Sequence, residues 1–294
     1  DPLFRSRDDF LDVYTTETPG VFRIVLPADA NLNVTVTATF PEKESMTNVS
    51  YIQADGTEAT TTSGVKVWVL DGTEGEELGQ SDSETWYICK GSMAYDHRLK
   101  TLGDVNIIMS GSLAIGTAES PVNYEGIDAN NNLCLYGQAS ATGTNSVTIN
   151  SNMQSIRSSS GAITITNCSL DLTSTYNEGI YASGNEKDIT ITGCAAGTNS
   201  VTINSDNKAI YSILGAVSIT NCSVDLTCTH NEGIDAKSGV TITGCAAGTN
   251  SVKVNSGMYS IYSSSGTVSI TNCSVVLSTD DASLDRKSGS AGMP

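Results

Sequence analysis

The feature that most constrains the fold is a short cysteine-containing sequence that returns along the second half of the chain. Copies of Thr-Asn-Cys-Ser begin at Thr166, Thr220 and Thr271, and copies of the variant Thr-Gly-Cys-Ala begin at Thr192 and Thr243. The two versions alternate along the chain. Self-similarity of this kind indicates a repeat protein, in which each unit packs mainly against its two neighbours.

A longer period contains two of these units. The string Glu-Gly-Ile begins at Glu125, Glu178 and Glu232, which are 53 and 54 residues apart. Each period divides into two half-units of about 25 residues, and each half-unit reads as three short strands separated by turns. Good helix formers at 3.6-residue spacing are absent, and a propeller blade would need about 40 residues.

A unit of three short strands is typical of one coil of a parallel β-helix. Residues 123–281 supply six such coils, and residues 103–116 (GDVNIIMSGSLAIG) form part of another. Right-handed winding is the default for parallel crossovers. The sequence therefore predicts an all-β chain that folds as a right-handed, single-stranded parallel β-helix with three strands in each coil.

One corner of the coil carries only asparagine or glycine, which tolerate the left-handed backbone conformation better than other residues. We therefore predict a turn with positive φ at Asn167, Gly193, Asn221, Gly244 and Asn272. The cysteine that follows is in phase with inward-facing residues, which predicts an interior column of Cys168, Cys194, Cys222, Cys245 and Cys273. Small apolar packing is the favoured role for this column, and vertical disulfides remain an alternative. The chain has no CxxC pair and two histidines, a poor ligand set for a transition metal.

The charge and the apolar pattern narrow the range of partners. A formal net charge of −17 opposes binding to nucleic acid, which requires clustered lysine and arginine. The sequence contains no run of 18 apolar residues, so we expect no insertion into a membrane. We also expect a monomer.

Three regions are expected. Residues 1–84 contain strand-like segments at 21–26, 33–40 and 64–70 between acidic turns, which predicts an irregular N-terminal β cap or a small separate β region. Residues 85–280 form the β-helix. Residues 281–294 have no periodicity and are expected to be a frayed tail or linker.

The main candidate for a binding site is an outward-facing row on the first strand of the coils. Alternation places one residue of each coil in this row: Asp128, Arg157, Tyr181, Tyr211, Asp235 and Tyr262. Stacked tyrosines offer an apolar ring and a polar hydroxyl to a sugar. The alternative is that tyrosine simply suits a strand surface.

Three glutamates that precede the first strand are weaker candidates for a metal site. Carboxylates of Glu125, Glu178 and Glu232, near Asp128 and Asp235, are suitable ligands for calcium. Equivalent glutamates would lie two coils apart, about 10 Å, which is too far to share one ion. The competing interpretation is a set of solvated charges that discourages pairing between sheet edges.

The second strand presents a further regular surface. Its outward positions form a ladder of Thr-x-Thr and Ser-x-Thr pairs over five coils, from Thr164 and Thr166 to Ser269 and Thr271. A flat threonine ladder of this kind also suits ice binding, although threonine is in any case a good strand former.

Catalysis is not expected. A glycosidase requires two carboxyl groups about 5–9.5 Å apart, and the outward row offers no neighbouring pair. Asp235 has Tyr211 and Tyr262 beside it, and Asp128 has Arg157. Basic residues that a pectate lyase would need are scattered through the coils. We therefore predict that the protein is not an enzyme and needs no cofactor, with calcium left open.

A family resemblance points to the same fold. The segments GDVNIIMSGSLAIG, NNNLCLYGQASATGTNSVTI and GAITITNCSLDL resemble cell-surface β-helix proteins of gut anaerobes, and more distantly the pectate-lyase-like superfamily. This resemblance implies a secreted or cell-surface bacterial protein that acts as a non-catalytic adhesion or carbohydrate-binding module. The implied partner is a polysaccharide or host glycan, or else a protein surface. The alternatives are a polysaccharide-degrading enzyme, an ice-binding protein and a spacer.

Overall fold

The computed structural model describes residues 43–53, 55–138, 145–184 and 187–280, together with the backbone of three short strands near the N-terminus. The chain divides into two units, Asp1–Glu42 and Lys43–Pro294. The described strands of the first unit, β1 (Phe4–Arg5), β2 (Asp12–Thr15) and β3 (Phe22–Val25), pair antiparallel in that order. The predicted strand at 33–40 and the predicted tail at 281–294 lie outside the described residues.

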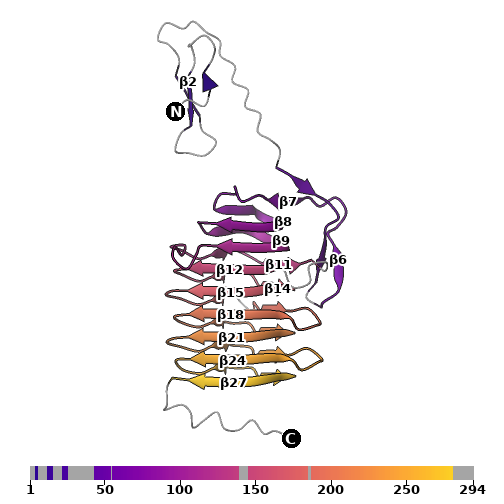
Figure 1. The fold of residues 1–294 in the computed structure, drawn as a ribbon, viewed down its shortest axis with the longest axis vertical. Coiled ribbons are helices and arrows are strands. Elements are labelled where there is room, and N and C mark those ends of the chain that lie inside the picture. The colour runs from indigo at the N-terminus through magenta and orange to yellow at the C-terminus, as the bar shows by residue number, and fades with distance from the viewer. Residues whose placement is uncertain are drawn as a thin grey trace. The chain divides into compact units, whose positions relative to one another are not determined.

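The second unit is a parallel β-helix, and every element described in it is a strand (Figure 1). Six coils each contribute three strands. The first strands are β10 (Ile127–Ala129), β13 (Ile156–Ser158), β16 (Ile180–Ala182), β19 (Ile210–Ser212), β22 (Ile234–Ala236) and β25 (Ile261–Ser263). The second strands are β11 (Leu133–Gly137), β14 (Ile163–Thr166), β17 (Ile189–Thr192), β20 (Val217–Thr220), β23 (Val240–Thr243) and β26 (Val268–Thr271). The third strands are β12 (Ser146–Ser151), β15 (Ser169–Ser174), β18 (Asn199–Ser205), β21 (Cys222–Cys228), β24 (Asn250–Ser256) and β27 (Cys273–Thr279).

Two further coils precede these six, and each is one long bent strand. β9 (Leu99–Ile115) pairs in parallel with β10, β11 and β12 in turn, and β8 (Glu77–Tyr95) pairs in parallel with β9. A parallel pairing of β7 (Val67–Leu70) with β8 begins the stack. Parallel pairing therefore begins within residues 1–84, and residue 84 lies inside β8. The predicted parallel β-helix with three strands per coil is confirmed, whereas its right-handed winding stays a prediction.

In-register stacking of branched apolar residues forms the core. Each first strand directs one isoleucine inward, and Ile127, Ile156, Ile180 and Ile210 stack on successive coils with no exposed surface. Second and third strands each add two inward residues per coil, such as Ile189 with Ile191. Full burial of one such side chain contributes about 1.5–3 kcal/mol, so a regular column in every coil supports a long stack.

The predicted left-handed corner is confirmed for the asparagines and wrong for the glycines. Asn167, Asn221 and Asn272 have φ of 52°, 55° and 55°, but φ is not positive at Gly193 or Gly244. Those two glycines serve a steric purpose. A Cβ atom on Gly193 would lie 2.3 Å from the carbonyl oxygen of Asn221, and the equivalent atom on Gly244 would lie 2.0 Å from that of Asn272.

The predicted column of five cysteines is also wrong, because asparagines alternate with cysteines in it. Asn199 pairs with Cys222 and Asn250 pairs with Cys273, and both asparagines are buried. Thiols in this column are consequently two coils, about 9.6 Å, apart, which is beyond the reach of a disulfide. Cys194 and Cys245 instead begin the loop of their coil, where the Oδ1 atoms of Asn199 and Asn250 accept their backbone N–H groups at 2.7 Å.

The start of the second unit folds back over the solenoid. β4 (Ser45–Met46) pairs antiparallel with β7, and β5 (Ser50–Ile52) and β6 (Glu58–Thr60) form a separate hairpin. Residues Val49, Val67, Val69, Ile88 and Ile108 form a second apolar cluster. The hairpin thus covers the outer face of the second strands in the first coils, a face that later coils leave open.

Candidate functional site

The predicted outward row is in register along the first strands. Asp128 pairs with Arg157, Arg157 with Tyr181, Tyr181 with Tyr211, Tyr211 with Asp235 and Asp235 with Tyr262. Two earlier coils extend it, because Asp128 pairs with Lys100 and Lys100 with Glu77. The sequence did not predict this extension, because β8 and β9 lack the turns that divide each later coil into three short strands. The row runs from Glu77, which is exposed, through buried Asp128 to Tyr262, which is 40% exposed.

A second column lies beside this row and supplies most of its polar contacts. It consists of the residues two positions before the inward isoleucine, among them Glu125, Gln154, Glu178, Lys208 and Glu232. Side chains of Glu125 and Glu232 are 11% and 12% exposed, so the interpretation of these glutamates as solvated edge charges is wrong. We call the two columns together the first-strand face.

The upper part of the first-strand face is a compact charge cluster. Nη1 of Arg157 lies 3.3 Å from Oε1 of Glu125 and 3.3 Å from Oδ1 of Asp128. The outward row contains no neighbouring carboxylate pair, as predicted, but the adjacent column brings Glu125 to the same guanidinium as Asp128. Burial and then the charge of Glu125 raise the pKa of Asp128, although Arg157, Arg98 and Lys100 act in the opposite direction.

Glu178 occupies the equivalent position two coils further on, but amides surround it instead of cations. Nε2 of Gln154 donates to its Oε2 at 2.8 Å, and Nδ2 of Asn207 donates to its Oε1 at 2.7 Å. Both carboxylate oxygens are therefore held in place by side chains of the two neighbouring coils. The third glutamate, Glu232, forms an ion pair with Lys208 at 3.3 Å.

The middle of the first-strand face is aromatic. The ring centroids of Tyr181 and Tyr211 are 5.5 Å apart, with an interplanar angle of 33°. Nζ of Lys208 lies 4.0 Å from the centroid of the Tyr211 ring and also forms ion pairs with Asp235 and Glu232 of the next coil. The ring of Tyr211 therefore contacts the Tyr181 ring of the preceding coil on one side and the ammonium group of Lys208 on the other. Carboxylates of the following coil hold that ammonium group in place, so these contacts fix the orientation of the Tyr211 ring.

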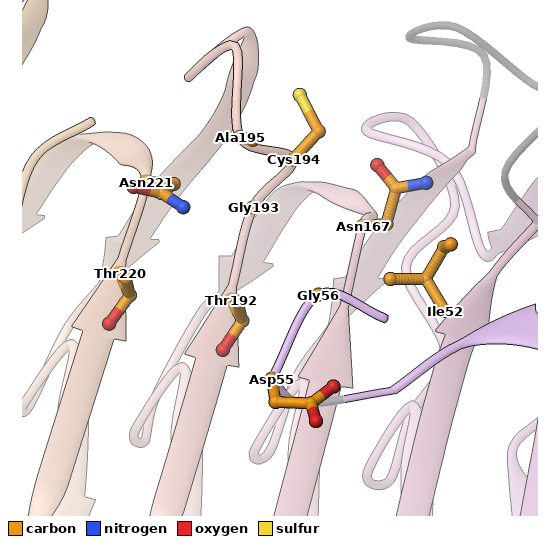
Figure 2. Close-up of a pocket in the computed structure, with 10 residues that line it drawn as sticks. All are labelled: Ile52, Asp55, Gly56, Asn167, Thr192, Gly193, Cys194, Ala195, Thr220 and Asn221. Atoms are coloured by element: carbon orange, nitrogen blue, oxygen red, sulfur yellow. The ribbon is translucent and has the colours of Figure 1, made fainter. Parts of the chain in front are cut away.

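A groove at the second-strand corner was not anticipated from the sequence (Figure 2). Its volume is about 470 Å³, and it lies between the turn of the β5–β6 hairpin and the corners that follow β14, β17 and β20. Its walls include Ile52, Asp55, Thr192, Thr220 and Asn221. No local sequence signal marks it, because it exists only where the hairpin lies against coils more than 100 residues later in the chain.

The same hairpin interrupts the threonine ladder. In-register pairing of Thr166 with Thr192 and of Thr192 with Thr220 is as predicted. However, Thr166 has no exposed surface and Thr192 has 8%, so the ladder is not a uniformly open face over five coils.

The thiols fall into two environments. Burial raises the pKa of Cys222 to about 12 and raises that of Cys168 further, which keeps both as inert thiols in the core. Cys194 is partly exposed in the groove. Burial tends to raise its pKa, but a contact with Oγ1 of Thr198 at 3.1 Å and nearby backbone N–H groups give a net lowering. All eight cysteines are free.

The three candidate glutamates do not come together at one point. Among the residues that the structure describes, no group of three or more histidine, cysteine, aspartate or glutamate side chains is arranged to hold a metal ion. Within the same ranges, no helix has the length and apolar character needed to cross a lipid bilayer. Comparison of the chain with models of protein families, with curated proteins and with solved structures found no match.

Proposed function

We propose that this protein is a secreted or cell-surface module that binds a polysaccharide or host glycan without transforming it. The ligand would lie along the first-strand face, parallel to the stack of coils. The observation that carries the proposal is the in-register sequence Arg157–Tyr181–Tyr211–Asp235–Tyr262. It places an aromatic centre between charged and hydrogen-bonding groups, a combination suited to the polar edges and apolar faces of sugar rings.

The spacing of the row suits a linear polymer. Strands of adjacent coils are about 4.8 Å apart, so equivalent side chains recur at that interval over the whole face. A polysaccharide likewise presents similar hydroxyl groups at regular intervals. Because the row is built on paired strands and not on loops, its groups need little reorganisation on binding.

The contacts of the two most closely spaced carboxylates are poorly suited to hydrolysis of a glycan. Glu125 and Asp128 are the acids nearest to a catalytic pair, and both contact the same nitrogen of Arg157. A general acid must deliver its proton to the leaving group, and a nucleophile or base must face the sugar. Two carboxylates that share a guanidinium and are nearly buried are better suited to stabilising the coil stack.

A glycan array probed with and without a calcium chelator tests the proposal. We expect retention of one class of glycan, at least tenfold weaker retention (about 1.4 kcal/mol) by Tyr181→Ala combined with Tyr211→Ala, and little change for Lys253→Ala on the third-strand face. If binding is lost only when calcium is removed, and not in the tyrosine variant, a calcium ion bridges the ligand to the protein. Binding that is unchanged in the tyrosine variant, or release of reducing sugar from the bound polysaccharide, would overturn the proposal.

A further inference from the structure

The groove beside the β5–β6 hairpin is open to solvent on one side and has the volume of a small-ligand site. Its volume of about 470 Å³ falls within the range of about 300–1,000 Å³ that is usual for such sites. One wall is the hairpin turn, and the other is formed by the outer corners of three adjacent coils (Figure 2). It lies at the end of the second strands, whereas the tyrosine row lies on the first strands, so the two sites are separate.

The hairpin wall is positioned by tertiary contacts. Tyr51 packs between two rings of the solenoid, with centroid distances of 5.2 Å to Trp86 and 4.9 Å to Tyr136. Nε2 of Gln138 also donates to the carbonyl oxygen of Ser50 at 3.0 Å. These contacts attach the base of the hairpin firmly, and its turn extends over Thr192.

Several polar groups in the groove have no protein partner. Thr192 is 8% exposed, and within the described part of the chain its hydroxyl makes no hydrogen bond. Figure 2 shows its hydroxyl and that of Thr220 pointing the same way from neighbouring strands, with Asp55 next to Thr192 on the side away from Thr220. The side chains of Thr220 and Asn221 likewise make no hydrogen bond in the described ranges. Thr220 and Asn221 are half-buried and Asp55 is exposed, so these polar groups are open to hydrogen bonds from a ligand or from water.

Asp55 offers one uncommitted carboxylate oxygen. The backbone N–H and the hydroxyl of Thr57 both donate to Oδ1, at 2.9 and 2.6 Å, and no group of the described residues donates to Oδ2. A ligand in the groove can therefore donate to Oδ2 without breaking an existing bond. Ile52 adds an apolar surface to the same wall.

We propose that this groove binds a single neutral sugar residue. A pyranose can donate one hydroxyl to Asp55, exchange hydrogen bonds with Thr192, Thr220 and Asn221, and place its apolar side against Ile52. Among the described residues that line the groove there is no lysine or arginine, which disfavours phosphates and other anions near Asp55. A single carboxylate is a weak ligand set for calcium, which usually takes six to eight oxygen ligands. The site is independent of the proposed function of the first-strand face.

The test uses the whole chain and a panel of methyl pyranosides of neutral hexoses and N-acetylhexosamines. Binding is followed by saturation-transfer NMR and titration. We expect at least one methyl pyranoside to bind the wild type, and about tenfold weaker binding by Thr192→Val, which removes a hydroxyl and keeps the shape. Asp55→Ala should weaken binding similarly. Thr271→Val, in the same ladder but outside the groove, should bind as the wild type does.

The outcomes separate this site from the first-strand face. Sugar binding that persists in the double tyrosine variant and fails in Thr192→Val supports the groove, whatever the glycan array shows. Absence of binding by every methyl pyranoside, or binding that Thr192→Val and Asp55→Ala leave unchanged, overturns the proposal. Circular dichroism and the urea midpoint of each variant establish that it is folded.

Discussion

Asn221 and Gly193 follow paired residues on neighbouring strands, yet the chain needs them for different reasons. Asn221 has φ of 55°, a conformation that costs most side chains about 1–2 kcal/mol. The φ of Gly193 is not positive, but any Cβ atom would collide with the backbone of Asn221. The alternation of asparagine and glycine at this corner therefore correctly indicated that the backbone is restricted there. The sequence could not show that asparagine is required for a positive φ and glycine for lack of space, because both residues tolerate the left-handed conformation.

Asn221 can be tested by two substitutions at the same position. Asn221→Val should destabilise the protein by about 2 kcal/mol, since a β-branched residue fits poorly at positive φ. Asn221→Gly should stay within about 1 kcal/mol of wild type, because glycine adopts this conformation freely. Urea unfolding measures both. Equal losses would show that the asparagine side chain, and not the backbone geometry, stabilises the corner.

Glu74 provides a test of pH dependence. Its side chain is 2% exposed. Burial raises its pKa, but hydrogen bonds from Lys43 and Tyr95 and from the backbone N–H group of Asp71 outweigh burial and lower the pKa overall. A carboxyl whose pKa is lower in the folded state stabilises that state above its unfolded pKa of about 4.3. This contribution is lost as the pH falls through the folded-state value.

Glu74→Gln should therefore be less stable than wild type by about 1–3 kcal/mol at pH 7, because charge-assisted hydrogen bonds are lost. The difference should shrink steadily below about pH 4, as the wild-type carboxyl becomes protonated. Urea midpoints of both proteins across this range provide the measurement. A difference that does not change with pH would indicate that Glu74 contributes by packing and not by its charge.

The β5–β6 hairpin is the element that sequence reasoning could not place. Strand register, the outward row and the inward isoleucines all followed from alternation, which is a local property of each coil. The docking of Tyr51 on Trp86 and Tyr136 depends on residues 35 and 85 positions apart, and no periodicity encodes such contacts. The charge cluster at Arg157 was not predicted for a similar reason. Its two carboxylates belong to different columns, and alternation within one strand does not show that they meet.

Tyr51→Ala should release the hairpin while leaving the coils intact. The substitution removes two ring contacts, each worth about 0.5–1.5 kcal/mol beyond the buried area. Amide exchange should accelerate in residues 45–60 and stay unchanged in β16 to β24. Tyr51→Phe keeps the ring and should behave as wild type. If exchange rises equally in the later coils, the hairpin is part of the cooperative core and not an attached element.

At the scale of the whole molecule, the solenoid is a stack in which each interior coil has two neighbours. The last described coil differs, because its inward residues are not covered to the same extent. Val275 and Leu277 are 44% and 46% exposed, whereas their register partners Val252 and Val254 are 1% and 0% exposed. Stability in such a stack is approximately a sum of unit and neighbour terms, so this coil should have the lowest stability.

Hydrogen exchange should therefore show a gradient along the coils. Amides of β25, β26 and β27 should open at a free energy on the order of several kcal/mol below those of β16, β17 and β18, because fewer apolar side chains hold them.

A matched pair of substitutions gives the same comparison at one column position: Val252→Ala should cost about 1–2 kcal/mol of stability, and Val275→Ala less than about half of that. Uniform protection along the stack, or equal costs for the two valines, would mean that the last coil is covered as completely as the others. The second result would also remove the basis for treating the coils as a nearest-neighbour series, since position in the stack would then have no energetic consequence.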